Sequence, residues 1–307
     1  MRKVFLTGAS GFIGRRVLAA LDSTRFGEVL CLMRAAAPPG APLPGHARAV
    51  PGSLEDPAPW RSAMAGCDAV IHTAALTGRG RAEDFERINV GGTRAVIEAA
   101  RAGGAGRLVF VSSIAAAYPN RRVYPYAQSK DAAEALVRSS GLRASIVRPT
   151  IVFGAGSAAW GPLKGLATLP VIPLFGDGAV RTQPVDVADV ARGIADLALA
   201  DPLPPGPIAF GGPESLSFEE LIQRIRRVAR PNDGPSPGRV VHIPVKPLLG
   251  PLFALESVVG PRLPVTAGQL MSFVCDSDAP PHPFWSARQG SLRTLDQMLA
   301  GSAGGGR

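Results

Sequence analysis

The stretch Thr7-Gly8-Ala9-Ser10-Gly11-Phe12-Ile13-Gly14 decides the fold of this chain. It follows the apolar run Val4-Phe5-Leu6 and opens a segment in which apolar residues recur at helical spacing. The order is a strand, a glycine turn and a helix start. Glycine lets the backbone approach a pyrophosphate, and the free N–H groups of a first helical turn bind that anion. We predict a dinucleotide site formed by Gly8, Ser10, Gly11, Phe12, Ile13 and Gly14.

The glycine spacing leaves an alternative open. The glycines stand three and three positions apart, which is not the literal G-x-G-x-x-G pattern. A glycine-rich turn that binds nothing is therefore the competing interpretation. The position of the turn, directly between a strand and a helix, favours the dinucleotide site.

Length and composition set the class of protein. The chain has 307 residues, of which 46% are hydrophobic, so it can form one large α/β domain or two smaller ones and is not mainly disordered. The N-terminus lacks the apolar core of a signal peptide, and no apolar run is long enough for a membrane span. We expect a cytoplasmic protein.

Cysteine, histidine and charge point away from metals and nucleic acids. The three cysteines and four histidines are scattered without ligand spacing, so we predict neither a disulfide framework nor a metal site. The net charge is +9, but the arginines are spread along the chain and not clustered. This distribution favours an anionic small molecule as ligand and no nucleic-acid partner.

The choice of cofactor depends on Arg34. Dinucleotide sites often carry an acid about 20 residues past the glycine turn, where it binds the ribose 2′-hydroxyl. Here Arg34 stands twenty residues after Gly14 and follows an apolar run at 28–33. Because arginine can neutralise a 2′-phosphate, we predict NADP(H) in preference to NAD(H). A solvated arginine at a strand end is the alternative.

Strand-like and helix-like segments alternate along the first half of the chain. We expect strands at 47–50, 69–75, 107–111 and 143–148, and helices at 56–65, 83–102 and 124–139. This alternation predicts an α/β fold with a Rossmann-like, doubly wound parallel sheet. We also predict contacts to the cofactor at the carboxyl ends of two of these strands. They are Ser53 and Leu54 after the strand at 47–50, and the small residues Thr73, Ala74 and Ala75 at the end of the strand at 69–75. His72 lies inside an apolar strand, and we expect a hydrogen-bonded core histidine.

The second half is less regular. Glycine and proline are frequent at 155–178, and we expect a short strand at 183–187, helices at 187–199 and 217–230, and a strand at 207–210. The apolar segment 245–259 is interpreted as a packed lid or core helix, with a membrane-surface contact as the alternative. We predict a dinucleotide-binding domain over 1–155, with 184–212 returning to it, and a smaller, irregular α/β substrate-binding part over 156–307.

A serine, a tyrosine and a lysine form a candidate acid–base group. Tyr126 and Lys130 are four residues apart on a predicted helix and leave the same face, while Ser113 ends the preceding strand. A nearby ammonium is expected to lower the pKa of the phenol, which is ordinarily about 10. Tyr-x-x-x-Lys alone is commonly a surface pair. Its place after a dinucleotide turn predicts proton transfer coupled to hydride transfer.

Together these motifs resemble the extended short-chain dehydrogenases/reductases, of the NAD-dependent epimerase/dehydratase family. The resemblance implies that Ser113, Tyr126 and Lys130 are catalytic, that Lys130 also binds the nicotinamide ribose, and that Asn89 supports a proton relay through water. It also implies that Pro149 flanks the nicotinamide. The segments that carry it are Thr7-Gly8-x-x-Gly11-x-x-Gly14, His72-Thr73-Ala74-Ala75, Asn89-Val90-x-Gly92-Thr93, Ser112-Ser113, Tyr126-x-x-x-Lys130, Arg148-Pro149 with Gly154, and Val185-Asp186-Val187-Ala188-Asp189-Val190-Ala191.

Departures from the family pattern bear on the reaction. Ser53 replaces an aspartate that often binds adenine, and Ile114-Ala115 stand where sugar-nucleotide dehydratases carry Asp-Glu. Ala117 replaces a tyrosine of sugar epimerases, whereas Arg181 could face a nucleotide diphosphate as an arginine does in those enzymes.

Another branch of the family is also similar. Gly176-Asp177-Gly178, Gln183-Pro184-Val185 and Leu263-Pro264-Val265-Thr266 resemble the branch that contains the NAD(P)-binding accessory subunit of respiratory complex I. Three functions stay open: an oxidoreductase acting on a carbonyl or secondary alcohol, a sugar-nucleotide epimerase that retains its cofactor, and a non-catalytic assembly or regulatory protein. A homodimer through the helices at 83–102 and 124–139 is implied by the family alone.

Overall fold

The computed structural model describes residues 1–34, 43–119, 121–204, 206–233, 238–245, 247–248, 250–252, 255, 270 and 273–303. The chain divides into two compact units. Unit 1 comprises 1–116, 126–148 and 188–208, and unit 2 comprises 117–125, 149–187 and 209–307. Each unit is described in turn.

Unit 1 is built on a seven-stranded sheet in the order β11-β6-β5-β4-β1-β2-β3. All pairings from β3 through β6 are parallel, and the order reverses between β1 and β4, which confirms the predicted doubly wound sheet. In a parallel sheet the carboxyl ends of the strands share one edge, so the segments that follow them gather there. The strands are β1 (Arg2–Thr7), β2 (Phe26–Met33), β3 (Ala47–Pro51), β4 (Ala69–His72), β5 (Leu108–Val111), β6 (Ala144–Pro149) and β11 (Pro207–Phe210).

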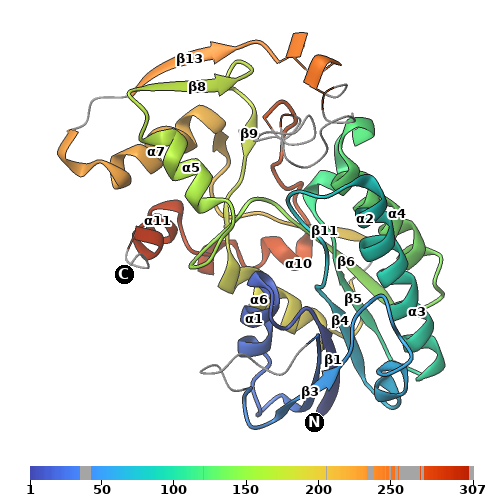
Figure 1. The fold of residues 1–307 in the computed structure, drawn as a ribbon. Helices are drawn as coiled ribbons and strands as arrows, with labels where there is room; N and C mark the ends of the chain where they lie inside the picture. The colour runs from blue at the N-terminus through green and yellow to red at the C-terminus, as the bar shows by residue number, and fades with distance from the viewer. Residues whose placement is uncertain are drawn as a thin grey trace. The chain divides into compact units, whose positions relative to one another are not determined.

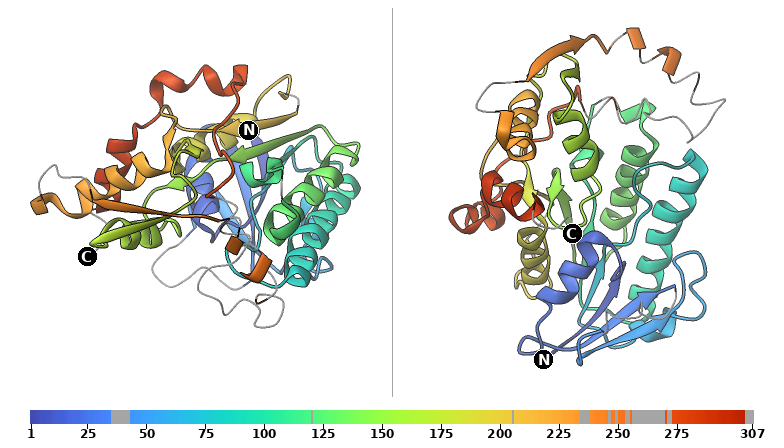
Figure 2. Two further views of the ribbon diagram at one scale, coloured as in Figure 1. Left: turned by 90° about the horizontal axis from the view of Figure 1, so that it is seen from above. Right: turned by 60° about the vertical axis from the view of Figure 1, so that its left-hand side comes forward.

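Helices cover both faces of this sheet, as its pattern of strands buried on both sides requires. Figures 1 and 2 show α3 and α4 on one face and α1 and α6 on the other. The helices are α1 (Phe12–Ala20), α2 (Ala82–Phe85), a π-helical segment (Glu86–Gly91), α3 (Gly92–Ala102), α4 (Pro125–Arg138) and α6 (Val187–Leu197).

The helix expected at 56–65 is the main error in unit 1. Only a 3₁₀ turn at Arg61–Met64 forms there. Pro57 and Pro59 supply no N–H donors and disrupt the first turns of a helix, which explains the difference. Other short 3₁₀ turns lie at Ile114–Ala117, Arg121–Val123, Pro231–Asp233 and Gln289–Ser291.

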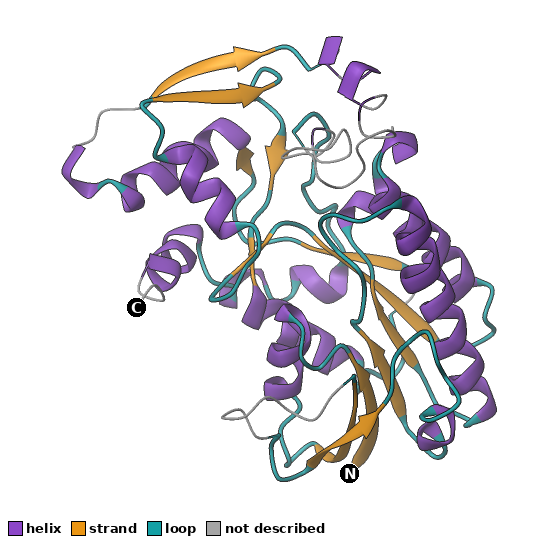
Figure 3. Ribbon diagram, viewed as in Figure 1, coloured by secondary structure: helices purple, strands orange, loops and turns teal. Residues whose placement is uncertain are grey.

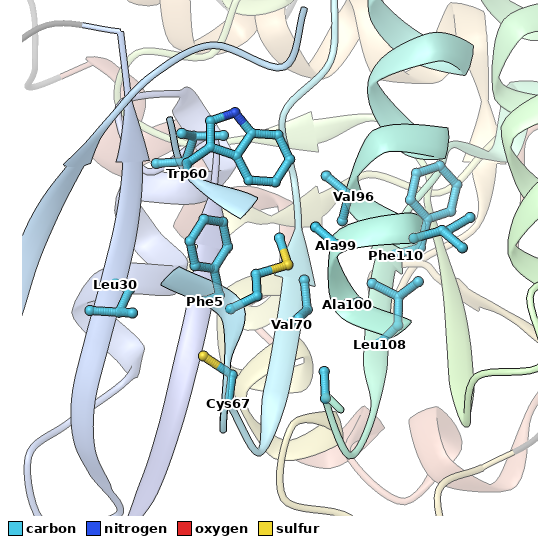
Figure 4. Close-up of a cluster of buried hydrophobic side chains, with 14 of the residues drawn as sticks. Phe5, Leu30, Trp60, Cys67, Val70, Val96, Ala99, Ala100, Leu108 and Phe110 are labelled. Atoms are coloured by element: carbon cyan, nitrogen blue, oxygen red, sulfur yellow. The ribbon is translucent and has the colours of Figure 1, made fainter. Parts of the chain in front are cut away.

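The core of unit 1 lies between the sheet and its helices. Side chains of β1, β4 and β5 gather with those of α3, as Figure 4 shows. Trp60 is fully buried, packs against Phe5 with ring centroids 5.9 Å apart, and donates a hydrogen bond from Nε1 to the Ser53 carbonyl oxygen at 2.6 Å. This indole therefore anchors the segment after β3 to the core.

The described part of unit 2 contains short paired strands and several helices (Figure 3). The strand pairs are β7 (Val152–Phe153) with β10 (Val185–Asp186), β9 (Arg181–Thr182) with β12 (Leu216–Ser217), and β8 (Val171–Phe175) with β13 (Arg239–Ile243). The helices are α5 (Trp160–Ala167), α7 (Phe218–Ala229), α10 (Pro283–Ser286) and α11 (Leu295–Ala303), of which α5, α7 and α11 share a core with β8.

Two expectations for the second half can be compared with unit 2. The helix expected from Ser217 is confirmed, and the Ser217 hydroxyl accepts the N–H of Glu220 as an N-cap. The glycine- and proline-rich stretch at 155–178 is more regular than expected, because it forms α5 and β8. The segment 245–259 and the motif at 263–266 lie largely or wholly outside the described residues.

Across the described ranges, none of the helices combines the length and the apolar character that crossing a bilayer requires.

Candidate active site

The glycine turn between β1 and α1 has a backbone conformation that favours glycine. Gly8 has a φ of +76°, and its carbonyl oxygen accepts the N–H of Gly11 at 2.8 Å. A Cβ on Gly14 would stand 1.9 Å from the Gly8 oxygen, and one on Gly8 would stand 2.6 Å from Thr73 Oγ1. The turn is therefore packed closely against the start of α1 and the segment after β4.

These contacts fit a dinucleotide. Gly11 is the residue before α1, and within the described ranges no side chain caps that first turn. Its N–H groups and the positive end of the helix dipole are thus left for an anion such as a pyrophosphate. Thr73, whose Oγ1 donates to the Thr7 carbonyl oxygen at 2.7 Å, begins the small-residue segment Thr73-Ala74-Ala75 at the same sheet edge.

The other predicted cofactor contacts follow β2 and β3, the two strands beside β1. Arg34 comes directly after β2 and is exposed, and Ser53 comes shortly after β3. Because β1, β2 and β3 are parallel neighbours, Arg34 and Ser53 lie at the edge that carries the glycine turn. Leu54 differs, since its side chain packs against the core and Gly92.

Ser113 and Tyr126 are brought together by a side-chain hydrogen bond. Ser113 follows β5, and Tyr126 lies in the first turn of α4, where its ring packs edge-on against Phe85 with centroids 6.1 Å apart. Burial raises the pKa of the Tyr126 phenol above 10, and the hydrogen bond with Ser113 only partly opposes this. The sequence led us to expect a lowered pKa, and in this structure burial outweighs the groups that would lower it.

Lys130 lies on the same face of α4, one turn after Tyr126, and is almost fully buried. Its Nζ donates to the Val111 carbonyl oxygen at 2.8 Å and lies 5.0 Å from the centre of the Phe110 ring. Burial lowers the pKa of Lys130 to about 8, and the carboxylate of Glu134 opposes that change. The lysine is thus tied to the end of β5, next to Ser113.

Asn89 is buried in the π-helical segment and joins two parts of unit 1. Its Oδ1 accepts the Leu76 N–H at 2.7 Å, while Nδ2 donates to the Leu76 carbonyl oxygen at 3.1 Å and to Ser129 Oγ at 2.9 Å. Ser129 donates in turn to the Tyr126 carbonyl oxygen at 2.8 Å. Asn89 therefore fastens the segment after β4 to the first turns of α4.

His72 is confirmed as a satisfied core histidine. Its Nδ1 lies 2.7 Å from Thr7 Oγ1 and its Nε2 lies 3.1 Å from Thr93 Oγ1. Burial, with a smaller effect of the Lys130 charge, lowers the pKa of His72 to about 3. The ring is neutral at neutral pH and links β1, β4 and α3.

Sequence reasoning did not single out Glu134. This side chain on α4 is fully buried and binds Ser112, Arg138 and Arg148. Its position in the sequence could have indicated it, because Glu134 stands four residues after Lys130 and eight after Tyr126, on the same helical face.

Two further predicted residues belong to unit 2. Pro149 ends β6 and is buried. The guanidinium of Arg181, which could have faced a nucleotide diphosphate, donates to the carbonyl oxygen of Ser215 and, at 3.0 Å, to Ser215 Oγ.

Comparison with known proteins identifies the group to which these features belong. The family model described as NAD(P)H-binding matches residues 8–201. Ceramide reductase of Caulobacter vibrioides is 35% identical over 191 residues, which are 61% of this chain but only 58% of that protein.

A second relative is matched over a larger share of its length. This protein, 4-hydroxy-2-methyl-3-oxo-4-farnesyl-3,4-dihydroquinoline-1-oxide ketoreductase of Stigmatella aurantiaca, is 32% identical over 244 residues, or 72% of each chain. Among solved structures, gox2253 shares the fold, with a TM-score of 0.74, 23% identity, and coverage of 99% of this chain and 98% of that one.

The family model covers most of unit 1, and the ketoreductase match extends over more than two thirds of the chain. The chain belongs to the NAD(P)H-binding extended short-chain dehydrogenases/reductases, the family of the NAD-dependent epimerases/dehydratases.

Proposed function

We propose that this protein is an NAD(P)H-dependent reductase that converts a ketone carbonyl to a secondary alcohol, with Tyr126 as the proton donor. One observation carries the proposal: the hydrogen-bonded pair Ser113 and Tyr126 lies at the carboxyl edge of the sheet that also holds the glycine turn. Lys130, on the same face of α4, completes the group.

When bound, the nicotinamide would supply a hydride to the carbonyl carbon. The Ser113 hydroxyl would donate a hydrogen bond to the carbonyl oxygen and hold it beside the phenol. Tyr126 would then donate its proton to that oxygen as negative charge develops there. A phenol whose pKa lies above 10 is protonated at neutral pH, which suits proton donation in reduction better than proton removal in oxidation.

The proposed substrate class follows from the two relatives. The name of one is ceramide reductase, and the name of the other describes a 3-oxo compound with a farnesyl group. Both molecules carry a long hydrocarbon chain. We therefore propose a ketone on a molecule with a long apolar chain, and NADPH as the donor because Arg34 lies exposed at the end of β2.

The alternatives from the sequence receive less support. Ile114-Ala115 offer no acid or base for elimination chemistry. Arg181 binds Ser215, which removes an argument for a nucleotide-sugar substrate. Cofactor that stays bound through gel filtration would favour an epimerase. Tight NADPH binding without turnover of any carbonyl compound would favour a non-catalytic role.

The testing experiment replaces Tyr126 by Phe. With NADPH and a panel of long-chain 3-oxo compounds, we expect reduction to fall by about 10²–10⁴-fold while NADPH affinity stays within a few-fold. Tyr124→Phe serves as the matched control on the adjoining turn and should keep most of the activity. An unchanged rate in Tyr126→Phe would refute the assignment.

We carry two other predictions into this proposal: a cytoplasmic location and a homodimer. The dimer would pair the helices predicted at 83–102 and 124–139, and sedimentation of the purified protein measures its mass directly.

A further inference from the structure

The carboxylate of Glu134 is the meeting point of three segments in unit 1. Its side chain is fully buried on α4 and accepts four hydrogen bonds. Ser112 Oγ donates to Oε1 at 2.6 Å, Arg148 donates from Nε to Oε1 at 2.8 Å and from Nη2 to Oε2 at 2.6 Å, and Arg138 donates from Nη1 to Oε2 at 2.8 Å.

These bonds connect the segments that carry the proposed chemistry. Ser112 directly precedes Ser113 at the end of β5, and its N–H also binds the Val147 carbonyl oxygen of β6 at 2.7 Å. Glu134 belongs to the helix that carries Tyr126 and Lys130. The Ser112–Glu134 bond therefore links the segment directly after β5, which carries Ser113, to the helix that presents the phenol.

The same carboxylate acts on Lys130 through its charge. The charged and titratable groups whose effects bear on Lys130 are Glu134 on its own helix and His72 on β4, while Arg138 and Arg148 bind Glu134 directly. His72 is neutral at neutral pH, and among the residues that the structure describes Glu134 supplies a negative charge that favours the ammonium form. Hydrogen bonds from Arg148, Ser112 and Arg138 outweigh the effect of burial and lower the pKa of Glu134, which keeps it ionised.

We propose that Glu134 is a positioning residue for the reaction: its buried carboxylate holds Ser112, and with it Ser113, against α4 and places a negative charge one helical turn from Lys130. This role in positioning presupposes the proposed reductase function. Its electrostatic part can be measured without turnover.

The chain offers a simple spectroscopic test, because it contains only four lysines, at 3, 130, 164 and 246. Protein labelled with ¹³C at lysine Cε yields a small set of NMR signals, and Lys130→Arg assigns one of them. In Glu134→Gln we expect the titration midpoint of Lys130 to fall by about one pH unit, since the favourable charge is gone and two guanidinium groups lose their partner. The matched control is Glu214→Gln, which removes the acid that pairs with Arg224 in unit 2 and should leave the midpoint in place.

Either of two results would overturn the electrostatic part. An unchanged midpoint in folded Glu134→Gln would mean that the carboxylate does not support the ammonium. A rise toward the ordinary value for lysine would mean that the variant admits water and that packing, not charge, is the role of Glu134. If Glu134→Gln does not fold, Glu134→Asp keeps the charge and should keep the midpoint near that of the wild type.

Ser112→Ala tests the positioning part separately. It removes one hydrogen bond and leaves the carboxylate charge, so the Lys130 midpoint should not move while kcat for reduction falls several-fold with KM for NADPH unchanged. A wild-type kcat in this variant would refute the positioning role. If Tyr126→Phe retains full activity, the proposed function is refuted. The NMR titration still decides independently whether Glu134 affects the protonation of Lys130.

Discussion

The guanidinium of Arg148 and the carboxylate of Glu134 meet through two parallel hydrogen bonds, from Nε to Oε1 at 2.8 Å and from Nη2 to Oε2 at 2.6 Å. The pair joins the end of β6 to the middle of α4, and the carboxylate is fully buried. A carboxylate taken out of water is stable only while its donors remain. The same two residues are therefore expected to affect both the stability of the fold and the geometry of the candidate active site.

Arg148→Ala should therefore destabilise the fold strongly. The variant leaves a buried carboxylate with two of its four donor bonds missing, and we expect the free energy of unfolding to fall by about 3 kcal/mol. Arg143→Ala is the matched control, because Arg143 pairs with Asp201 at 2.9 Å while both side chains are exposed, at 58% and 70%. Its loss should cost less than about 1 kcal/mol. Urea denaturation measures both, and equal losses would contradict the role of burial.

Lys130 should make stability depend on pH in the alkaline range. Its pKa falls from 10.5 in the unfolded chain to about 8 in the folded protein. Between these values the unfolded state binds more protons, so stability rises with pH, and below about 8 the full penalty applies. Relative to Lys130→Met, the wild type should gain at most about 3 kcal/mol between pH 8 and 10.5. Denaturation of both proteins across this range checks the sign, and parallel curves would contradict the burial of a titrating lysine.

Gly14→Ala should disrupt the dinucleotide site. The new Cβ would lie 1.9 Å from the Gly8 carbonyl oxygen, so the turn or the start of α1 must move, and with it the N–H groups that would bind the phosphates. We expect NADPH affinity to fall by at least about tenfold, measured by nicotinamide fluorescence. Gly165→Ala is the control, since this residue lies within α5, a Cβ there meets nothing within 4 Å, and helix propensity favours alanine. Wild-type affinity in Gly14→Ala would mean that the turn does not bind the nucleotide.

Arg34 should distinguish NADPH from NADH. Arg34→Ser removes the exposed cation after β2, and we expect NADPH affinity to fall by about tenfold or more while NADH affinity stays the same. Arg25→Ser changes an arginine that comes just before β2, at the opposite end of that strand, and should affect neither cofactor. Calorimetric titration with both nucleotides is the measurement, and wild-type protein that binds NADH tightly and NADPH weakly would refute the proposal.

Much of unit 1 could be predicted because its signals are local. The apolar run before Thr7, the glycine turn and the alternation of strand and helix segments depend on residues close in sequence, and the sheet confirms them. The boundaries were less accurate. The strand expected to run to Ala75 ends at His72, and the long helix through Asn89 contains a π-helical segment. Both deviations occur where Thr73 and Asn89 make contacts with residues far away in the chain.

Unit 2 was harder to predict because its elements depend on packing between distant segments. α5 and β8 lie in a stretch rich in glycine and proline, and they form in a core shared with α7 and α11, which come from residues about 50 to 130 positions later. No local pattern in that stretch indicates a helix or a strand. The tertiary core overrides weak local propensity there.

The sequence alone determined that this protein has a Rossmann-like sheet, a glycine turn suited to a dinucleotide, and a serine, a tyrosine and a lysine in an order that suits proton transfer. It could do so because strand, turn and helix signals and the four-residue spacing on a helix are properties of neighbouring residues. Only the tertiary structure decided that burial raises the pKa of Tyr126 and lowers that of Lys130, and that Glu134 meets both Ser112 and Arg148. Desolvation and long-range hydrogen bonds depend on which distant segments surround a group, and no local pattern in the chain records that.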